Sequence, residues 1–92
     1  MHAVVVRVTL NDREKATTFL REQIVPQVSQ APGLVNAYWT RSDDGGNGAS
    51  MIVFESEEAA KAMAERIGGG DGPPDEAATI ESIEVREVVA SA

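Results

Sequence analysis

The residues of this 92-residue chain whose side chains could hold a small molecule gather in one short segment. Asn36, Tyr38, Trp39 and Arg41 bring an amide, a phenol, an indole and a guanidinium close together along the chain. Such groups orient a ligand by hydrogen bonding and by aromatic contact. A core position would need only the volume of Tyr38 and Trp39, and a buried Asn36 could equally make a structural hydrogen bond. The residue types alone therefore leave binding and packing open.

Other common kinds of site find little support in the sequence. His2 is the only histidine, so no convincing Ser/His/Asp triad can be assembled, and the absence of cysteine excludes disulfides and thiolate metal sites. The acidic residues at 43–44 and at 71–76 lack the spacing of a calcium-binding loop. We expect them to lie in solvated loops, with Arg41 pairing with Asp43 or Asp44 at the surface.

The charge of the chain argues against nucleic acid and membranes as partners. It has 15 acidic and 8 basic residues, for a net charge of −7, and the basic residues are scattered singly. Such a surface repels phosphate backbones and anionic lipids. The N-terminus lacks the basic region and long apolar run of a signal or membrane segment. A chain without cysteine fits a reducing compartment, so we expect a soluble, cytoplasmic protein.

Hydrophobic periodicity predicts a single domain over residues 1–92 that begins with a strand and a helix. The β-branched run His2–Thr9 is typical of a strand covered on both sides. Asn11, with Glu14 three residues later, resembles a capping box that opens a helix. Pro26 predicts a kink or early fraying of this helix, which must end before Pro32.

The remaining chain predicts two strands, a helix and a final strand. Turn-forming residues join the first two of these strands, and Ser56 is a good N-cap for the helix. The apolar residues of the last strand change parity, which predicts a bulge near Ser82. The expected elements are the strands Leu34–Arg41 and Ala49–Glu55, a helix from Ser56 that is stopped by Gly68–Gly70, and a strand from about Thr79 to Val89.

Alternation along the strand after Pro32 places adjacent aromatic residues on opposite faces of the sheet. Tyr38 and Trp39 should therefore separate, one toward the helices and one away from them. Val35 is assigned to the face of Trp39, and Leu34 and Asn36 to the face of Tyr38. Which of the two faces is covered by the helices does not follow from parity alone.

The element order β-α-β-β-α-β is that of a ferredoxin-like α+β fold, with two helices on one face of a four-stranded antiparallel sheet. By parity, the other face carries Val5, Ala49, Met51 and Val53. An exposed apolar surface of this kind marks an interaction site or an aggregation hazard. We therefore predict a homodimer in which the two sheets pack face to face.

The stretch Pro32–Met63 resembles the dimeric α+β barrel superfamily, and within it the antibiotic biosynthesis monooxygenase branch. The Pro-Gly-Leu turn, the hairpin and the run Val-Phe-Glu-Ser-Glu-Glu-Ala carry the resemblance. In that branch an aromatic strand end is followed by Glu-Ser/Asn-x-Glu-Ala, which opens the second helix. The order of elements along the whole chain is consistent with the same superfamily.

The resemblance implies a cofactor-independent monooxygenase that acts on or binds a small aromatic or polyketide-like molecule, with neither a metal nor a cofactor. In such chemistry the deprotonated substrate reacts with oxygen, while the protein supplies orientation and a dry cavity. The site residues it suggests are Asn36, Tyr38, Trp39 and Phe54, with no catalytic residue identified. The alternative is a non-catalytic ligand-binding or assembly module of the same fold.

The haem-degrading members of the superfamily are a poorer match. They use an Asn on the first strand, a Trp at the end of the third strand and a His on the second helix. Here the strand His2–Thr9 has no Asn, Phe54 stands at the Trp position, and Glu57–Ile67 contains no His. Haem degradation is therefore not expected.

Overall fold

The computed structural model describes residues 1–92 apart from the side chain of Asp71. The strand Leu34–Arg41 has the predicted bounds, and the ends of the other strands differ from the predicted ones by at most two residues, the usual uncertainty of such boundaries. In chain order the elements are β1 (His2–Leu10), α1 (Arg13–Phe19), a π-helical turn (Leu20–Ile24), α2 (Val25–Ser29), β2 (Leu34–Arg41), β3 (Asn47–Phe54), α3 (Glu57–Arg66), a second π-helical turn (Ile67–Asp71) and β4 (Ala78–Glu87).

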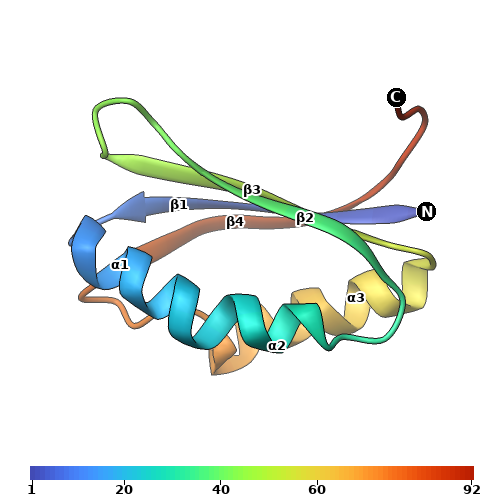
Figure 1. Ribbon diagram of the computed structural model, residues 1–92, viewed down its shortest axis with the longest axis horizontal. Coiled ribbons are helices and arrows are strands. Elements are labelled where there is room, and N and C mark those ends of the chain that lie inside the picture. Colours follow the sequence, from blue (N-terminus) through green and yellow to red (C-terminus); the bar gives the residue numbers. More distant parts are fainter.

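The strands form one antiparallel sheet in the order β2-β3-β1-β4, so that β1 and β3 are central. Figure 1 shows α1, α2 and α3 on one side of the sheet, while the β2–β3 hairpin and the C-terminus bend toward the other side. This arrangement confirms the predicted ferredoxin-like α+β fold with helices on one face. Within the described part of the chain, no helix has the length and apolarity needed to cross a lipid bilayer.

The hydrophobic core lies where the two central strands meet α3. Val4 of β1 and both Ile52 and Phe54 of β3 are almost completely enclosed. Ala60 and Met63 of α3 are buried against them. Because central strands are covered by neighbours on both edges and by a helix above, their helix-facing side chains are the most buried in the sheet.

The N-terminus of α1 differs from the predicted one by one residue. Asp12 is the N-cap, and its Oδ1 accepts a hydrogen bond of 3.1 Å from the N–H of Lys15. The prediction that Asn11 caps the helix was wrong. Its amide instead donates to the backbone oxygen of Asp75 at 2.7 Å and to Oγ1 of Thr79 at 2.8 Å, tying the start of β4 to the end of β1.

The helical segment between β1 and β2 is irregular next to its proline, as predicted. Pro26 lies in the first turn of α2, directly after the π-helical turn Leu20–Ile24. The N–H of Val25 donates to the carbonyl of Leu20, five residues back. Because proline lacks an N–H and its ring crowds the carbonyl four residues earlier, a widened turn accommodates it without breaking the helix.

A bulge at the start of β2 corrects the predicted assignment of its first two residues. Leu34 pairs with Phe54 and Asn36 pairs with Val53, which leaves Val35 as an extra residue. Leu34 consequently packs against the core, while Val35 is 46% exposed, the reverse of the prediction. From Asn36 onward the predicted alternation holds.

A second bulge lies in β4, where the change of parity predicted one. Arg7 pairs with Ser82 and Val8 pairs with Ile80, so Glu81 has no partner of its own on β1. Ile80 and Ile83, which a regular strand would place on opposite faces, both pack toward the core. The bulge near Ser82 is confirmed.

The glycine run 68–70 ends the helical segment after α3, as predicted. A second π-helical turn continues through Ile67–Asp71, and Gly70, with φ of 115°, is the residue that leaves the helical conformation. Glycine adopts this backbone conformation without the steric cost that a Cβ would impose. Ser56 does cap α3 as predicted, since its Oγ accepts a 3.2 Å hydrogen bond from the N–H of Ala59.

Candidate functional site: a cavity between the helices and the sheet

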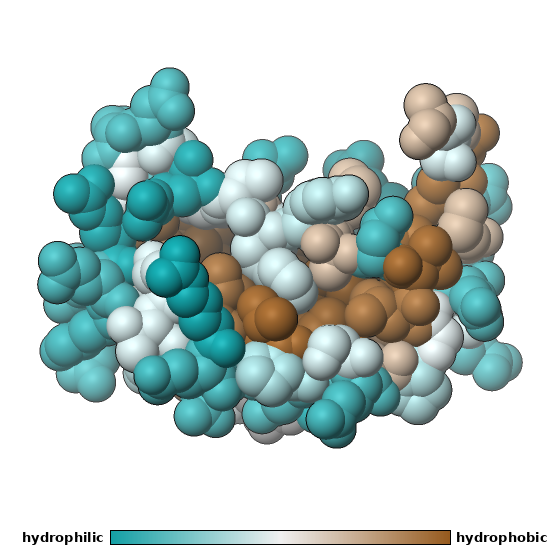
Figure 2. Space-filling view, in the orientation of Figure 1, coloured by the Kyte–Doolittle hydropathy of each residue, from teal (hydrophilic) through white to brown (hydrophobic). Residues whose placement is uncertain are grey.

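A cavity of about 470 Å³ lies between the sheet and the helical layer formed by α1, the π turn and α2. α3 packs directly against β1, β3 and β4, whereas α1 and α2 stand further from the strands. Figure 2 shows hydrophobic side chains in a hollow between the sheet and these helices. The volume lies within the range of roughly 300–1,000 Å³ that is typical of small-molecule sites.

Two cross-strand rows of residues form the floor of the cavity. Ser50 of β3 pairs with Trp39 of β2 and with Val6 of β1, and all three line the cavity. The next row contains Gly48, which pairs with Val8 and Arg41. A Cβ on Gly48 would lie 3.1 Å from both Cγ2 of Val8 and the carbonyl oxygen of Thr40, so a side chain there would crowd its neighbours in this part of the floor.

The roof is the apolar face of the helical segment at its π turn. Leu20 and Ile24, both half-buried, line the cavity together with Val28 of α2. Pro26 is the residue that favours the widened turn in this roof. Such π turns are frequent at functional sites because they shift side chains out of the regular helical positions.

The charged groups that line the cavity are all cationic. Arg21 of the π turn, Arg41 at the end of β2 and Arg66 at the end of α3 line it, and none of its described lining residues is acidic. Nη1 of Arg41 donates a 3.4 Å hydrogen bond to Oγ1 of Thr17, which links β2 to α1 across the cavity. The prediction that Arg41 pairs with Asp43 or Asp44 was wrong, since its hydrogen-bond partner in the structure is Thr17.

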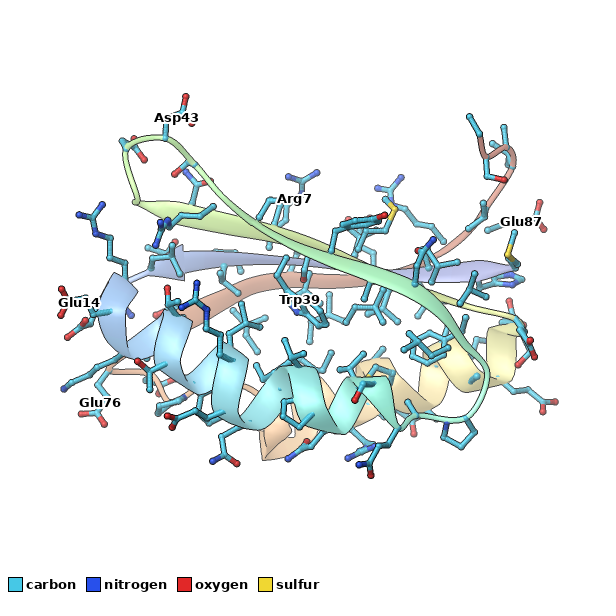
Figure 3. All side chains as sticks on the ribbon, viewed as in Figure 1. Arg7, Glu14, Trp39, Asp43, Glu76 and Glu87 are labelled. Atoms are coloured by element: carbon cyan, nitrogen blue, oxygen red, sulfur yellow. The ribbon has the colours of Figure 1, made fainter. Side chains whose placement is uncertain are left out.

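The four predicted ligand-binding residues lie in three different environments. Trp39 lines the cavity, and Figure 3 shows it pointing from the sheet toward the helices. Phe54 faces the helices and is fully buried in the core. Asn36 and Tyr38 are exposed on the open face, Tyr38 with 68% of its surface accessible. The opposite orientation of Tyr38 and Trp39 is confirmed, and the four residues do not form one cluster.

The remaining polar residues singled out in the sequence have local partners. Nε2 of His2 lies 3.5 Å from Oε2 of Glu57 at the start of α3. In the β2–β3 hairpin, Oδ1 of Asp44 accepts hydrogen bonds from Oγ of Ser42 at 2.6 Å and from the N–H of Gly46 at 2.8 Å. Both bonds lower the pKa of Asp44 below its ordinary value, and the bond from Ser42 has the larger effect. The 43–44 acidic pair therefore shapes a turn, while the side chain of Asp71 lies outside the described residues.

Sequence reasoning missed the cationic lining and the role of Gly48. Arg21, Arg41 and Arg66 are far apart in the chain, and they converge only because α1 to α2, β2 and α3 surround the same cavity. One signal was available for Arg21. It directly follows Leu20 in the apolar helical repeat, so that it had to lie at the border of the buried face.

No model of a known protein family matches this sequence, and no curated protein matches it significantly. Solved structures do match its fold. The chain is similar to SnoaB, a cofactor-independent oxygenase from Streptomyces nogalater, with a TM-score of 0.77 and 12% identity over 98% of this chain and 94% of that one. It is also similar to the ActVA-Orf6 monooxygenase of Streptomyces coelicolor, solved with nanaomycin D, with a TM-score of 0.57 and 17% identity over 99% and 92% of the two chains.

A third similar structure is a dimeric ferredoxin-like protein from an uncultured marine organism, with a TM-score of 0.61 and 13% identity over 100% of this chain and 98% of that one. At these identities the likeness concerns the fold alone. The chain therefore has the fold of the antibiotic biosynthesis monooxygenase-like dimeric α+β barrel proteins.

Proposed function

We propose that the helix–sheet cavity binds a small aromatic or polyketide-like molecule, and that the protein oxidises it as a cofactor-independent monooxygenase. The observation that carries the proposal is the cavity itself, a space of about 470 Å³ with apolar walls and Trp39 in its floor. Two proteins of similar fold are described as a cofactor-independent oxygenase and as a monooxygenase solved with nanaomycin D. A cavity of this kind binds by excluding water around an apolar ligand and orients it with few polar groups.

The proposed reaction uses the substrate as its own reductant. A ring CH₂ group loses a proton, the carbanion passes electrons to O₂, and the CH₂ becomes a carbonyl while the second oxygen atom leaves as water. None of the described residues that line the cavity is an Asp, Glu or His, so the proton passes to water at the open side. The hydroxyl of Ser50, the indole N–H of Trp39 and the Arg41 guanidinium are among the cavity's donors for a developing anion.

The proposal includes a homodimer and a cytoplasmic location. The open sheet face carries Met51, 48% exposed, and Tyr38, 68% exposed, with Val5 beside them in register. One protein of similar fold is described as dimeric. Covering this face with a second copy removes the apolar surface from water. In that arrangement Asn36 and Tyr38 contact the partner subunit, and their role as ligand contacts remains a prediction. The cytoplasmic location rests on the cysteine-free composition.

Oxygen uptake with a panel of anthrone-type polycyclic ketones, whose central ring carries the CH₂ group that the reaction oxidises, tests the activity. We expect uptake by the native protein and a loss of about tenfold or more in Ser50→Phe, since Ser50 lies in the cavity floor and a phenyl ring there fills the site. The matched control is Ala62→Phe on the exposed side of α3, which should retain the native rate. Ligand-dependent increases in melting temperature without oxygen uptake would contradict the enzyme and favour the non-catalytic binding module.

A further inference from the structure

The charges that surround the cavity are opposite in sign to the net charge of the protein. The chain has 15 acidic and 8 basic residues. Nevertheless Arg21, Arg41 and Arg66 line the cavity, and no acidic residue does so among the described lining residues. A random choice of charged side chains from this sequence would more often place acids there. The cavity is thus a cationic site in an anionic molecule.

The three arginines approach the cavity from three separate elements. Arg21 comes from the π turn of the roof, Arg41 from the end of the edge strand β2, and Arg66 from the last turn of α3. No ion pair or hydrogen bond of the Arg21 side chain is found among the described residues. The partner of Arg41 is the neutral hydroxyl of Thr17, which leaves the positive charge of the guanidinium uncompensated.

One acidic side chain shares a hollow with Arg41 but does not line the cavity. Glu14 lies with Arg13, Thr17, Thr18 and Arg41 around a neighbouring hollow. Glu14 is absent from the cavity lining, and the neighbouring hollow contains two arginines against this one acid. The charge that a ligand in the cavity would meet is therefore positive. Near low-dielectric walls, such charges act on a ligand more strongly than they would in open water.

We propose that the ligand of this cavity is an amphipathic anion: an apolar, preferably aromatic body enclosed by the cavity, with one carboxylate-like or sulfonate-like head group held at the arginines. This inference rests on one part of the proposed function, namely that the cavity is the ligand site. Guanidinium groups suit this task because they remain charged and present several N–H donors in one plane to an oxyanion. Neutral aromatic molecules of the same size would fill the cavity but leave the charges of Arg21 and Arg41 without a counter-charge.

Two fluorescent dyes with the same ring system test the proposal directly. Anilinonaphthalene sulfonate carries an anionic head group, and phenylnaphthylamine lacks it. We expect Arg21→Gln and Arg41→Gln each to reduce the preference for the anionic dye about fivefold, the size of an exposed charge interaction. The double variant should reduce it about twenty-fivefold if the two free-energy effects add. Raising the salt concentration should weaken binding of the anionic dye only.

The control for net charge is Lys61→Gln, which makes the same change of −1 on an exposed turn of α3 away from the cavity. It should leave the preference for the anionic dye unchanged. Arg21 and Arg41 are exposed, so we expect their glutamine variants to retain the native melting temperature. An equal loss of affinity for both dyes would overturn the proposal, because the arginine stems would then act by packing rather than by charge.

A cavity-filling variant separates this inference from the proposed function. Ser50→Phe should abolish binding of both dyes if the cavity is the ligand site. Suppose that both dyes bind in the cavity and that the glutamine variants keep the native preference for the anionic dye. The proposal of an anionic ligand is then overturned, while the cavity remains a binding site. If Ser50→Phe binds both dyes like the native protein, the cavity as ligand site is overturned, and the proposed function with it.

Discussion

Replacement of Phe54 with alanine is expected to lower the free energy of unfolding by about 3–5 kcal/mol, the usual cost of deleting a buried aromatic side chain. Phe54 is 1% exposed and packs in the core with Ile52 and Met63. Its ring has no solvent-facing side, so that the space left by its removal cannot be filled by water without further loss. Urea denaturation followed by circular dichroism measures the change.

Two further variants make this stability prediction specific. Phe54→Leu keeps most of the volume and should cost less than about 1.5 kcal/mol. Phe19→Ala removes the same ring from a half-buried position outside the core, so its cost should be clearly smaller than that of Phe54→Ala. Equal costs for Phe54→Ala and Phe19→Ala would show that Phe54 is not a core residue and would reopen its predicted role as a ligand contact.

Substitution of Met51 with lysine is expected to convert the proposed dimer into a monomer at micromolar concentration. Met51 lies in the middle of the open sheet face, paired with Val5 on one side and Tyr38 on the other. In a two-fold interface each substitution occurs twice. Two unpaired ammonium groups buried between facing sheets cost several kcal/mol, which corresponds to a rise of roughly a hundredfold or more in the dissociation constant.

Sedimentation equilibrium checks the result. The native protein should sediment at twice the 9.8 kDa of the chain, and Met51→Lys at the mass of one chain. The matched control is Ala62→Lys on the exposed side of α3, which makes the same change of charge on the opposite side of the molecule. If Ala62→Lys dissociates the protein as readily, or if the native protein is already a monomer, the sheet-to-sheet interface is wrong.

Much of the fold follows from local patterns in the sequence. The period-two alternation of β1 separates Val4 and Val6 from Val5, and the structure keeps that separation. Ser56 supplies a local hydrogen bond that needs no tertiary context, so its capping role is predictable. Asn11 was misassigned because its amide bonds to the distant Asp75 and Thr79, and no local pattern contains that information.

The candidate site was less predictable because it depends on spacing between layers. Parity correctly separated Tyr38 from Trp39, but it could not tell which of them faces the helices. The cavity exists because α1 and α2 stand away from the sheet while α3 packs on it, and this difference arises from the whole fold. Arg21 and Arg41 line the same cavity only because of that arrangement. Their shared role as cationic lining residues could therefore be inferred only once the structure was known.

The fluorescence of Trp39 tests the central claim, that the helix–sheet cavity is the ligand site, most directly. Trp39 is the only tryptophan and lines the cavity floor beside Ser50. Titration with anilinonaphthalene sulfonate should quench its emission by energy transfer, with saturation at one dye per subunit, and Ser50→Phe should remove the saturable phase. Binding that leaves the emission of Trp39 unchanged, or equal saturable quenching in Ser50→Phe, would contradict the claim.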